Sequence, residues 1–208
     1  MDYNAHLKMS PTGLAIVKAF ESCMEAVPGR PGFFKPYICP AGVLTIGWGH
    51  TNHHEPKFTT ASVWSQKQCD DVLANVMVTF ENHVRKHAKV SLKQCEFDAL
   101  VSWSYNTGGP ATATLWRKLN AGDKASVPRE LAKWNRGGGK VLKGLVRRRK
   151  SEAELFVGDF VAALKTAQVK APASVPAKAP IAPQAPKAAP AGFLAALLAF
   201  FKRKPNAA

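Results

Sequence analysis

Residues 37–51, which read YICPAGVLTIGWGHT, constrain the fold of this chain more than any other stretch. A turn at residues 40–42 leads into a short β-like run over 43–46, and glycines then stand on both sides of Trp48. Glycines and a proline at these spacings break a helix and favour a tight hairpin. The chain must therefore build a small β element into whatever else it forms.

Helical periodicity fills most of the remaining sequence as far as residue 168. A helix is predicted to begin after Ser10-Pro11 and to continue until the Pro/Gly-rich residues 28–32 end it. Further helices are predicted over residues 62–87, 91–107, 112–123, 127–135 and 144–165. The apolar stripe predicted for the second helix consists of Val63, Val72, Leu73, Val76 and Phe80. The expected fold class is α+β, mostly α-helical, with a small β-hairpin near the N-terminal third.

Composition divides the chain into three parts. Residues 1–168 have the composition of a globular domain, residues 169–191 form an Ala/Pro/Lys-rich linker, and residues 192–208 form a short amphipathic basic tail. As a helix the apolar part of the tail would be about 15 Å long, too short to cross a bilayer. We expect it to lie in a membrane interface; docking on the domain and a lack of structure remain alternatives.

The chain is strongly basic, with a formal net charge of +15. Its first 168 residues alone carry 23 basic and 14 acidic side chains. Such a surplus favours a polyanionic partner: nucleic acid, an anionic membrane or lipopolysaccharide, or a bacterial wall. No nucleic-acid-binding module is recognisable, so nucleic acid is the least favoured of these. A role in solubility alone is the alternative, and we expect a monomer.

The N-terminal residues lack an apolar core of signal-peptide length. We therefore expect synthesis in the cytosol and, if the protein works outside the membrane, release by another route. The four cysteines, Cys23, Cys39, Cys69 and Cys95, show no CxxC pair, and His83/His87 lack a third ligand. The sequence predicts no metal site and no cofactor.

Glu21 is a candidate acid. It lies on the first predicted helix beside Phe20, close to the apolar face formed by Leu14 and Val17. Apolar surroundings disfavour an ionised carboxylate and so raise its pKa, as a general acid at neutral pH requires. Spacing alone leaves open a second interpretation, in which Glu21 is a solvated helix residue.

Several ordered motifs together indicate a family. They are FES at 20–22, PY at 36–37, GVLTIGWGHT at 42–51, QCEFDALVSWSYNTGG at 94–109, LWRKLNAGD at 115–123 and KWNRGGGKVLKGLVRRRKSEAEL at 133–155. Over about residues 11–160 the chain resembles the phage-type lysozymes (endolysins) of glycoside hydrolase family 24. The resemblance implies a lysozyme-like fold. It also implies hydrolysis of the β-1,4 bond between N-acetylmuramic acid and N-acetylglucosamine in peptidoglycan. With no signal peptide, it implies synthesis in the cytoplasm of a bacterial host and release through a holin-type route.

The resemblance also implies catalytic roles. Glu21 matches the general acid, Thr45 matches the threonine that helps hold the attacking water, and Cys39 stands where the family most often has Asp. The segment between Glu21 and Cys39 is longer than usual and must loop out. A neutral thiol activates water weakly, so a cation from Lys35 or the arginines at 147–148 is expected to favour the thiolate. The alternative is an inert Cys39, with Glu21 and Thr45 carrying the reaction.

Supporting roles follow from the same motifs. Gly47 is expected to let the hairpin backbone approach the sugar, Trp48 to stack on it, and Asn106 and Thr107 to line the cleft. His50 is expected to be a structural hydrogen-bonding residue. Hydrolysis with inversion is the preferred reaction; retention, with Cys39 as the nucleophile, is the alternative. A lytic transglycosylase and a non-catalytic wall- or membrane-binding protein remain alternatives.

Overall fold

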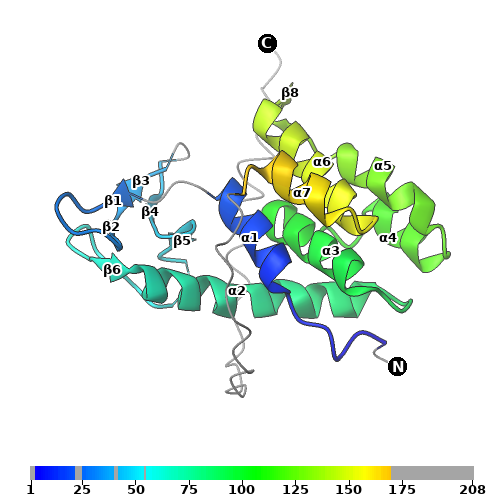
Figure 1. Ribbon diagram of the computed structural model, residues 1–208, viewed down its shortest axis with the longest axis horizontal. Helices are drawn as coiled ribbons and strands as arrows, with labels where there is room; N and C mark the ends of the chain where they lie inside the picture. The colour runs from blue at the N-terminus through cyan, green and yellow to red at the C-terminus, as the bar shows by residue number, and fades with distance from the viewer. Residues whose placement is uncertain (1–2, 22–24, 40–41, 54, 170–208) are drawn as a thin grey trace, which may run out of the picture.

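The computed structural model describes residues 3–21, 25–39, 42–53 and 55–169. The strands β1 to β6 gather at one end of the molecule, and helices α3 to α7 form the other end (Figure 1). The long helix α2 runs beneath both ends, with α1 between them. The predicted linker and tail lie outside the described residues, apart from Val169.

The described residues form an α+β fold, as predicted. The helices are α1 (Pro11–Phe20), α2 (Gln66–His87), α3 (Gln94–Thr107), α4 (Thr114–Asn120), α5 (Val127–Ala132), α6 (Lys143–Phe156) and α7 (Phe160–Ala167), with a 3-10 turn at Lys124–Ser126. The strands are β1 (Glu25–Ala26), β2 (Phe33–Lys35), β3 (Tyr37–Ile38), β4 (Leu44–Ile46), β5 (His50–Thr51), β6 (Trp64–Ser65), β7 (Arg136–Gly137) and β8 (Lys140–Val141).

The N-terminal segment is fastened to α2, α3 and the loop between them. Buried Asn4 donates to Val90 O at 3.0 Å and accepts from Leu92 N at 2.9 Å. Met9 N donates to Glu81 Oε1 at 2.7 Å. These contacts fix the direction in which the chain enters α1.

Helix α1 begins at a strong cap and ends earlier than predicted. Ser10 caps it through Gly13 N, and the Ser10 backbone N–H and hydroxyl both donate to buried Asp98. A Cβ atom on Gly13 would lie 2.8 Å from Asp98 Cβ, so glycine permits the close approach to α3. The helix ends at Phe20 and Glu21 is its C-cap residue, so the prediction of a helix reaching residues 28–32 is wrong.

Two three-stranded antiparallel sheets follow α1, in the orders β3–β4–β5 and β1–β2–β6. The first is the predicted hairpin, with Thr45 opposite Tyr37 and Thr51. The second belongs to the long segment between Glu21 and Cys39, which was predicted only to loop out. In the structure β1 and β2 form a hairpin that pairs with β6. The extra residues are thus held by backbone hydrogen bonds.

Three further differences from the predicted elements have local causes. Helix α2 begins at Gln66, because Ser65 and Gln68 form a capping box; Trp64 and Ser65 are in a strand, and Val63 is exposed rather than part of the stripe. The predicted helix over residues 144–165 is two helices, separated at Gly158 with φ of +86°. The β7–β8 hairpin was not predicted.

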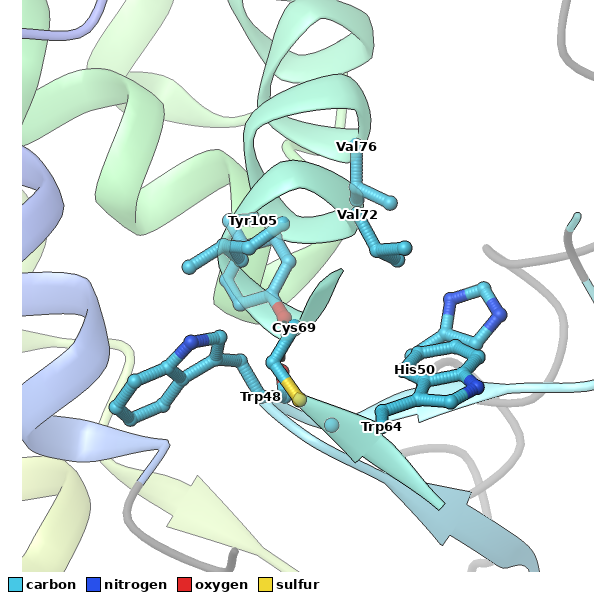
Figure 2. A pocket seen from close by; sticks show the side chains of 9 residues that line it. Trp48, His50, Trp64, Cys69, Val72, Val76 and Tyr105 are labelled. Carbon is cyan, nitrogen blue, oxygen red and sulfur yellow. Dashed lines mark hydrogen bonds between the residues drawn. The ribbon is translucent and has the colours of Figure 1, made fainter. Parts of the chain in front are cut away.

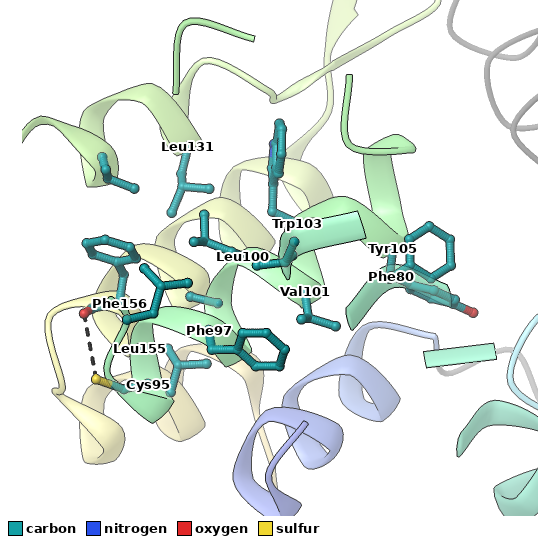
Figure 3. Packing of buried hydrophobic residues seen from close by; sticks show 14 of the residues in the cluster. Phe80, Cys95, Phe97, Leu100, Val101, Trp103, Tyr105, Leu131, Leu155 and Phe156 are labelled. Carbon is teal, nitrogen blue, oxygen red and sulfur yellow. Dashed lines mark hydrogen bonds between the residues drawn. The ribbon is translucent and has the colours of Figure 1, made fainter. Parts of the chain in front are cut away.

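The main core lies around α3, nearly all of whose residues are buried. Figure 3 shows Phe97, Leu100 and Trp103 of this helix among side chains of neighbouring helices, including Leu131 and Leu155. The Trp103 ring makes edge-to-face contacts with Trp116 and Trp134, with centroid separations of 5.6 and 5.4 Å. Such a core rigidly supports the residues at the ends of α3 and along α6.

Candidate active site

Glu21 lies where α1 ends, beside the glycine turn of the β4–β5 hairpin. Its Oε1 forms an ion pair with Arg148 Nη1 of α6 at 2.5 Å. A Cβ atom on Gly49 would lie 3.5 Å from Glu21 Oε2, so the hairpin backbone passes close to the carboxylate. The Glu21 side chain is 22% exposed, while that of Arg148 is only 4% exposed. The carboxylate is therefore accessible from outside and held from inside.

Tyr105 of α3 completes the inner wall beside Glu21. Its hydroxyl donates to Trp48 O at 3.1 Å, tying α3 to the hairpin turn. Burial raises the pKa of Tyr105 well above its usual value, and the charge of Glu21 raises it further. The phenol is thus a neutral donor near the carboxylate. Tyr105 was not among the predicted site residues.

Cys39 and Thr45 lie on one face of the β3–β4–β5 sheet. Cys39 N donates to Val43 O at 3.0 Å, continuing the ladder in which Tyr37 is opposite Thr45. Because side chains alternate along a strand, Cys39, Tyr37 and Thr45 belong to the same face. Thr45 is buried, and its hydroxyl also donates to Val43 O, at 2.9 Å. Cys39 is half-buried at the turn that follows β3.

Gly47 and Trp48 are held firmly in the hairpin turn. Gly47 has φ of +60°, and a Cβ there would lie 2.9 Å from Cys69 Sγ, so only glycine fits. The indole of Trp48 donates to Asp70 Oδ1 at 2.6 Å, and Lys18 Nζ lies 5.2 Å from the ring centroid. One face of Trp48 is therefore occupied by a cation of the protein itself. Its predicted stacking on a sugar stays a prediction.

A small cavity of about 10 Å³ lies behind the hairpin turn. Figure 2 shows its lining, with Cys69 Sγ beside Trp48, and with His50 and Trp64 on the far side. This volume holds one water at most, so the cavity is no sugar site. Burial and the nearby Asp70 charge raise the pKa of Cys69 to about 11, so this thiol stays neutral.

His50 has the structural role that the sequence predicted. It is buried, its Nε2 is 2.9 Å from Pro56 O, and its ring packs on Phe58 and Trp64. Burial lowers its pKa. His50 therefore stabilises the loop after β5 as a neutral imidazole.

The end of α3 places Asn106 and Thr107 differently. Thr107 is buried, and its hydroxyl donates to Trp103 O at 2.8 Å and accepts from Gly109 N at 3.2 Å. Asn106 is half-buried, and its Oδ1 accepts from Arg149 Nη2 at 2.9 Å. The Thr107 hydroxyl thus forms hydrogen bonds with backbone groups at the end of α3, whereas the Asn106 side chain forms a hydrogen bond with Arg149, a buried charged residue of α6.

Lys35 and Arg147, two of the cations proposed for Cys39, have their own contacts. Lys35 Nζ lies 3.6 Å from Glu25 Oε1, and Arg147 donates to Gln168 at 2.9 Å while packing over the Phe20 ring. The third, Arg148, forms an ion pair with Glu21. The predicted effect of these cations on the Cys39 thiol stays a prediction.

His83 and His87, for which the sequence offered no third metal ligand, are stacked on each other. The His83 and His87 ring centroids are 4.1 Å apart. Among the described residues, no group of three or more His, Cys, Asp or Glu side chains could hold a metal ion.

The sequence and the fold are both similar to those of known proteins. Residues 32–152 match the phage lysozyme family. The chain belongs to this family. The match includes Cys39, Thr45 and Arg148 but begins after Glu21, within the β1–β2 hairpin. The place of Glu21 in the site therefore rests on its contacts with Arg148 and the hairpin.

Several phage lysozyme relatives support the assignment. An endolysin of Bacillus phage PZA is 35% identical over 156 residues, covering 72% of this chain and 55% of the relative. The chain thus spans about half the length of this relative. An endolysin structure from Escherichia coli O157:H7 phage FAHEc1 is 32% identical with a TM-score of 0.62, covering 74% of this chain and 96% of that one. The muramidase domain of SpmX from Asticaccaulis excentricus is 26% identical with a TM-score of 0.61, covering 73% and 99%.

Proposed function

We propose that this phage lysozyme is a muramidase, which hydrolyses the β-1,4 bond between N-acetylmuramic acid and N-acetylglucosamine in peptidoglycan. The observation that carries the proposal is the position of Glu21. It is a partly exposed carboxylate at the end of α1, ion-paired at 2.5 Å with a buried arginine and next to the glycine turn. Family membership and a solved relative described as a muramidase domain support it. The basic surface suits an anionic wall.

Glu21 acts as the general acid. Its protonated form gives a proton to the glycosidic oxygen as the bond from that oxygen to the anomeric carbon breaks. The carboxylate left behind is stabilised by Arg148, whose other carboxylate partner, Glu152, is fully buried. The ion pair therefore favours the charge that develops as the proton leaves.

Cys39 and Thr45 assist the attacking water. They belong to one face of the hairpin sheet, where a thiolate can accept a proton from water while the threonine helps to place it. The water oxygen bonds to the anomeric carbon, so the products are two sugars with one water added. Attack by water from the side opposite the leaving group would invert the anomeric centre.

The test compares wild type with Glu21→Gln on permeabilised bacteria. We expect wild type to clear the suspension and to release reducing ends, and the variant to lose at least 100-fold in rate, roughly the contribution of a general acid. Equal lysis by both proteins would remove Glu21 from the mechanism. Mass spectrometry of the products identifies the reaction, because hydrolysis adds a water and a lytic transglycosylase would leave a 1,6-anhydro sugar.

We also propose that the tail, residues 192–208, acts on anionic bacterial membranes, and that the protein reaches the wall through a holin-type route. The apolar and basic residues of the tail support the first proposal. No helix of the described part of the chain is long and apolar enough to span a bilayer. Lysis by the cloned gene in cells without a holin would contradict the second.

A further inference from the structure

A buried carboxylate on α6, Glu152, is the centre of a polar network inside the domain. It is fully buried, and its Oε1 accepts from Ser102 Oγ at 2.7 Å, from Arg148 Nε at 3.2 Å and from Arg149 Nη2 at 2.9 Å. Its Oε2 lies 2.8 Å from Arg149 Nε. The Glu152 carboxylate thus holds two adjacent arginines, Arg148 and Arg149, whose other contacts differ.

The two arginines have different outer partners. Arg148 reaches Glu21, whereas Arg149 reaches Asn106 at the end of α3. Burial opposes the charge of Arg148, but Glu21 and Glu152 outweigh it and raise its pKa. Burial lowers the pKa of Arg149 to about 10, which leaves it charged at neutral pH. The network therefore holds two cations and two carboxylates, and it extends from the proposed acid to Asn106.

The contact with Arg149 determines which way the Asn106 amide faces. A guanidinium can only donate hydrogen bonds, so the atom that faces it must be the amide oxygen. The NH₂ group of half-buried Asn106 is left as a donor, with no hydrogen-bond partner among the described residues. A donor of fixed direction suits a carbonyl oxygen on a ligand and not an amine.

We infer that Asn106 is a specificity-determining residue that donates a hydrogen bond to the carbonyl oxygen of a substrate acetamido group, and that Arg149 and Glu152 are positioning residues for it. Both sugars of the peptidoglycan strand carry an acetamido group, so such a donor would distinguish the acetylated strand from a deacetylated one. The inference rests on the proposed function, because it takes the wall glycan as the ligand. It assigns Glu152 a second task, since the same carboxylate also holds Arg148 beneath Glu21.

The test is a binding measurement, so it does not depend on turnover. In a Glu21→Gln background, calorimetry compares soluble wall glycan strands with the same strands after N-deacetylation. We expect the parent to prefer acetylated strands and Asn106→Ala to reduce that preference about fivefold to tenfold, roughly the value of one neutral hydrogen bond. Arg149→Lys should reduce it in the same direction, because lysine cannot hold the amide in the same way.

The matched control is Glu154→Gln, on the same helix. Glu154 is partly buried, with Oε1 3.8 Å from the exposed Lys150 Nζ, and it makes no contact with Glu152, Arg149 or Asn106 in the described hydrogen bonds and ion pairs, so its loss should leave the preference unchanged. Thermal melting of each variant checks that it is folded. If Arg149→Lys does not fold, Asn106→Ala still tests the role of Asn106, because it changes only a half-buried side chain.

Each outcome has a distinct meaning. A preference kept by Asn106→Ala overturns the specificity role of Asn106. A preference lost in Asn106→Ala but kept in folded Arg149→Lys overturns the positioning role. Failure of the proposed function would be seen separately, as the absence of reducing ends from walls treated with wild type.

Discussion

At the scale of single residues, the proposed site contains a carboxylic acid, Glu21, and a thiol, Cys39. Glu21 is partly exposed, as a proton donor must be, and its ion pair with Arg148 stabilises the carboxylate that is left when the proton has gone. Cys39 is proposed to stand where the family most often has a carboxylate. A thiol has a reference pKa near 8.5, well above that of a carboxyl. The ionisation of residue 39 should therefore be visible in the pH dependence of the rate.

We predict that Cys39→Asp shifts the optimum of kcat/KM to lower pH, because a carboxylate is already ionised where a thiol is neutral. Cys39→Ser should lose about 100-fold in kcat, since a hydroxyl is not a base at these pH values. Profiles of rate against pH for the three proteins provide the measurement. Three superimposable profiles would show that residue 39 is inert.

Gly47 permits a second prediction at this scale. Gly47→Ala should destabilise the protein by about 1–2 kcal/mol for the positive φ and by about 1–3 kcal/mol more for overpacking against Cys69. Gly122→Ala is the matched control, since Gly122 has φ of +81° but nothing within 4 Å of its Cβ position. Urea unfolding of both variants measures the difference. Equal losses would mean that Cys69 yields without cost.

At the scale of elements, α2 carries a titrating group whose effect has a definite sign. Burial, together with the charges of the neighbouring His87 and Lys86 and against the opposing effect of the Gly109 backbone, lowers the pKa of His83 on this helix to about 4. The unfolded chain therefore binds more protons than the folded one between about pH 4 and 6.5. Stability should rise with pH through that window and level off above it.

We predict that His83→Gln flattens this rise, by about 1 kcal/mol after allowing for solvent screening of a half-buried ring. The exposed His6 provides the control, because His6→Gln should keep the slope of wild type. Thermal melting at several pH values between 4 and 7 gives the comparison. An unchanged slope in His83→Gln would assign the effect to other groups.

The elements also show which features a sequence can predict. The hairpin at residues 37–51 and the presence of most helices follow from turn chemistry and periodicity. The early end of α1 at Phe20 does not, because nothing local prevents another turn of helix. The strands that follow pair instead through long-range contacts, β1 with β2 and β2 with β6. The break at Gly158 carried a sequence signal, a glycine followed by the N-cap residue Asp159.

Site residues follow the same division. Glu21, Cys39 and Thr45 came from motifs, whereas Tyr105 and the Asn106–Arg149 contact join segments far apart in the chain. The spacing of Arg148, Arg149 and Glu152 is a sequence signal for ion pairs along one helix. Only the fold reveals that those pairs are buried and that they reach Glu21 and Asn106.

At the scale of the whole molecule, α2 connects the strand-rich end to the helical end. Its 22 residues span about 33 Å. Asp70 on this helix accepts from the Trp48 indole at 2.6 Å and pairs with Lys18 of α1 at 2.7 Å. The hairpin and α1, which carry the two sides of the proposed site, are thus both held by the same residue of α2.

The division into a domain and a tail predicts separable activities. Deleting residues 192–208 should leave hydrolysis of stripped walls unchanged, because every group of the proposed site lies before residue 153. Killing of intact Gram-negative cells should fall, since the basic amphipathic segment is lost. Plate counts and turbidity assays on the full-length and the shortened protein provide the comparison. Unchanged killing by the shortened protein would contradict the membrane role of the tail.

The fastening of the first residues has a practical consequence for anyone engineering this protein. Asn4, Met9 and Ser10 together set the angle at which α1 leaves for Glu21. An affinity tag that replaces these amino acids would loosen the position of Glu21, the proposed acid, and we expect activity to fall although no residue of the proposed site has been changed. Purification handles belong ahead of Met1, or beyond the far terminus.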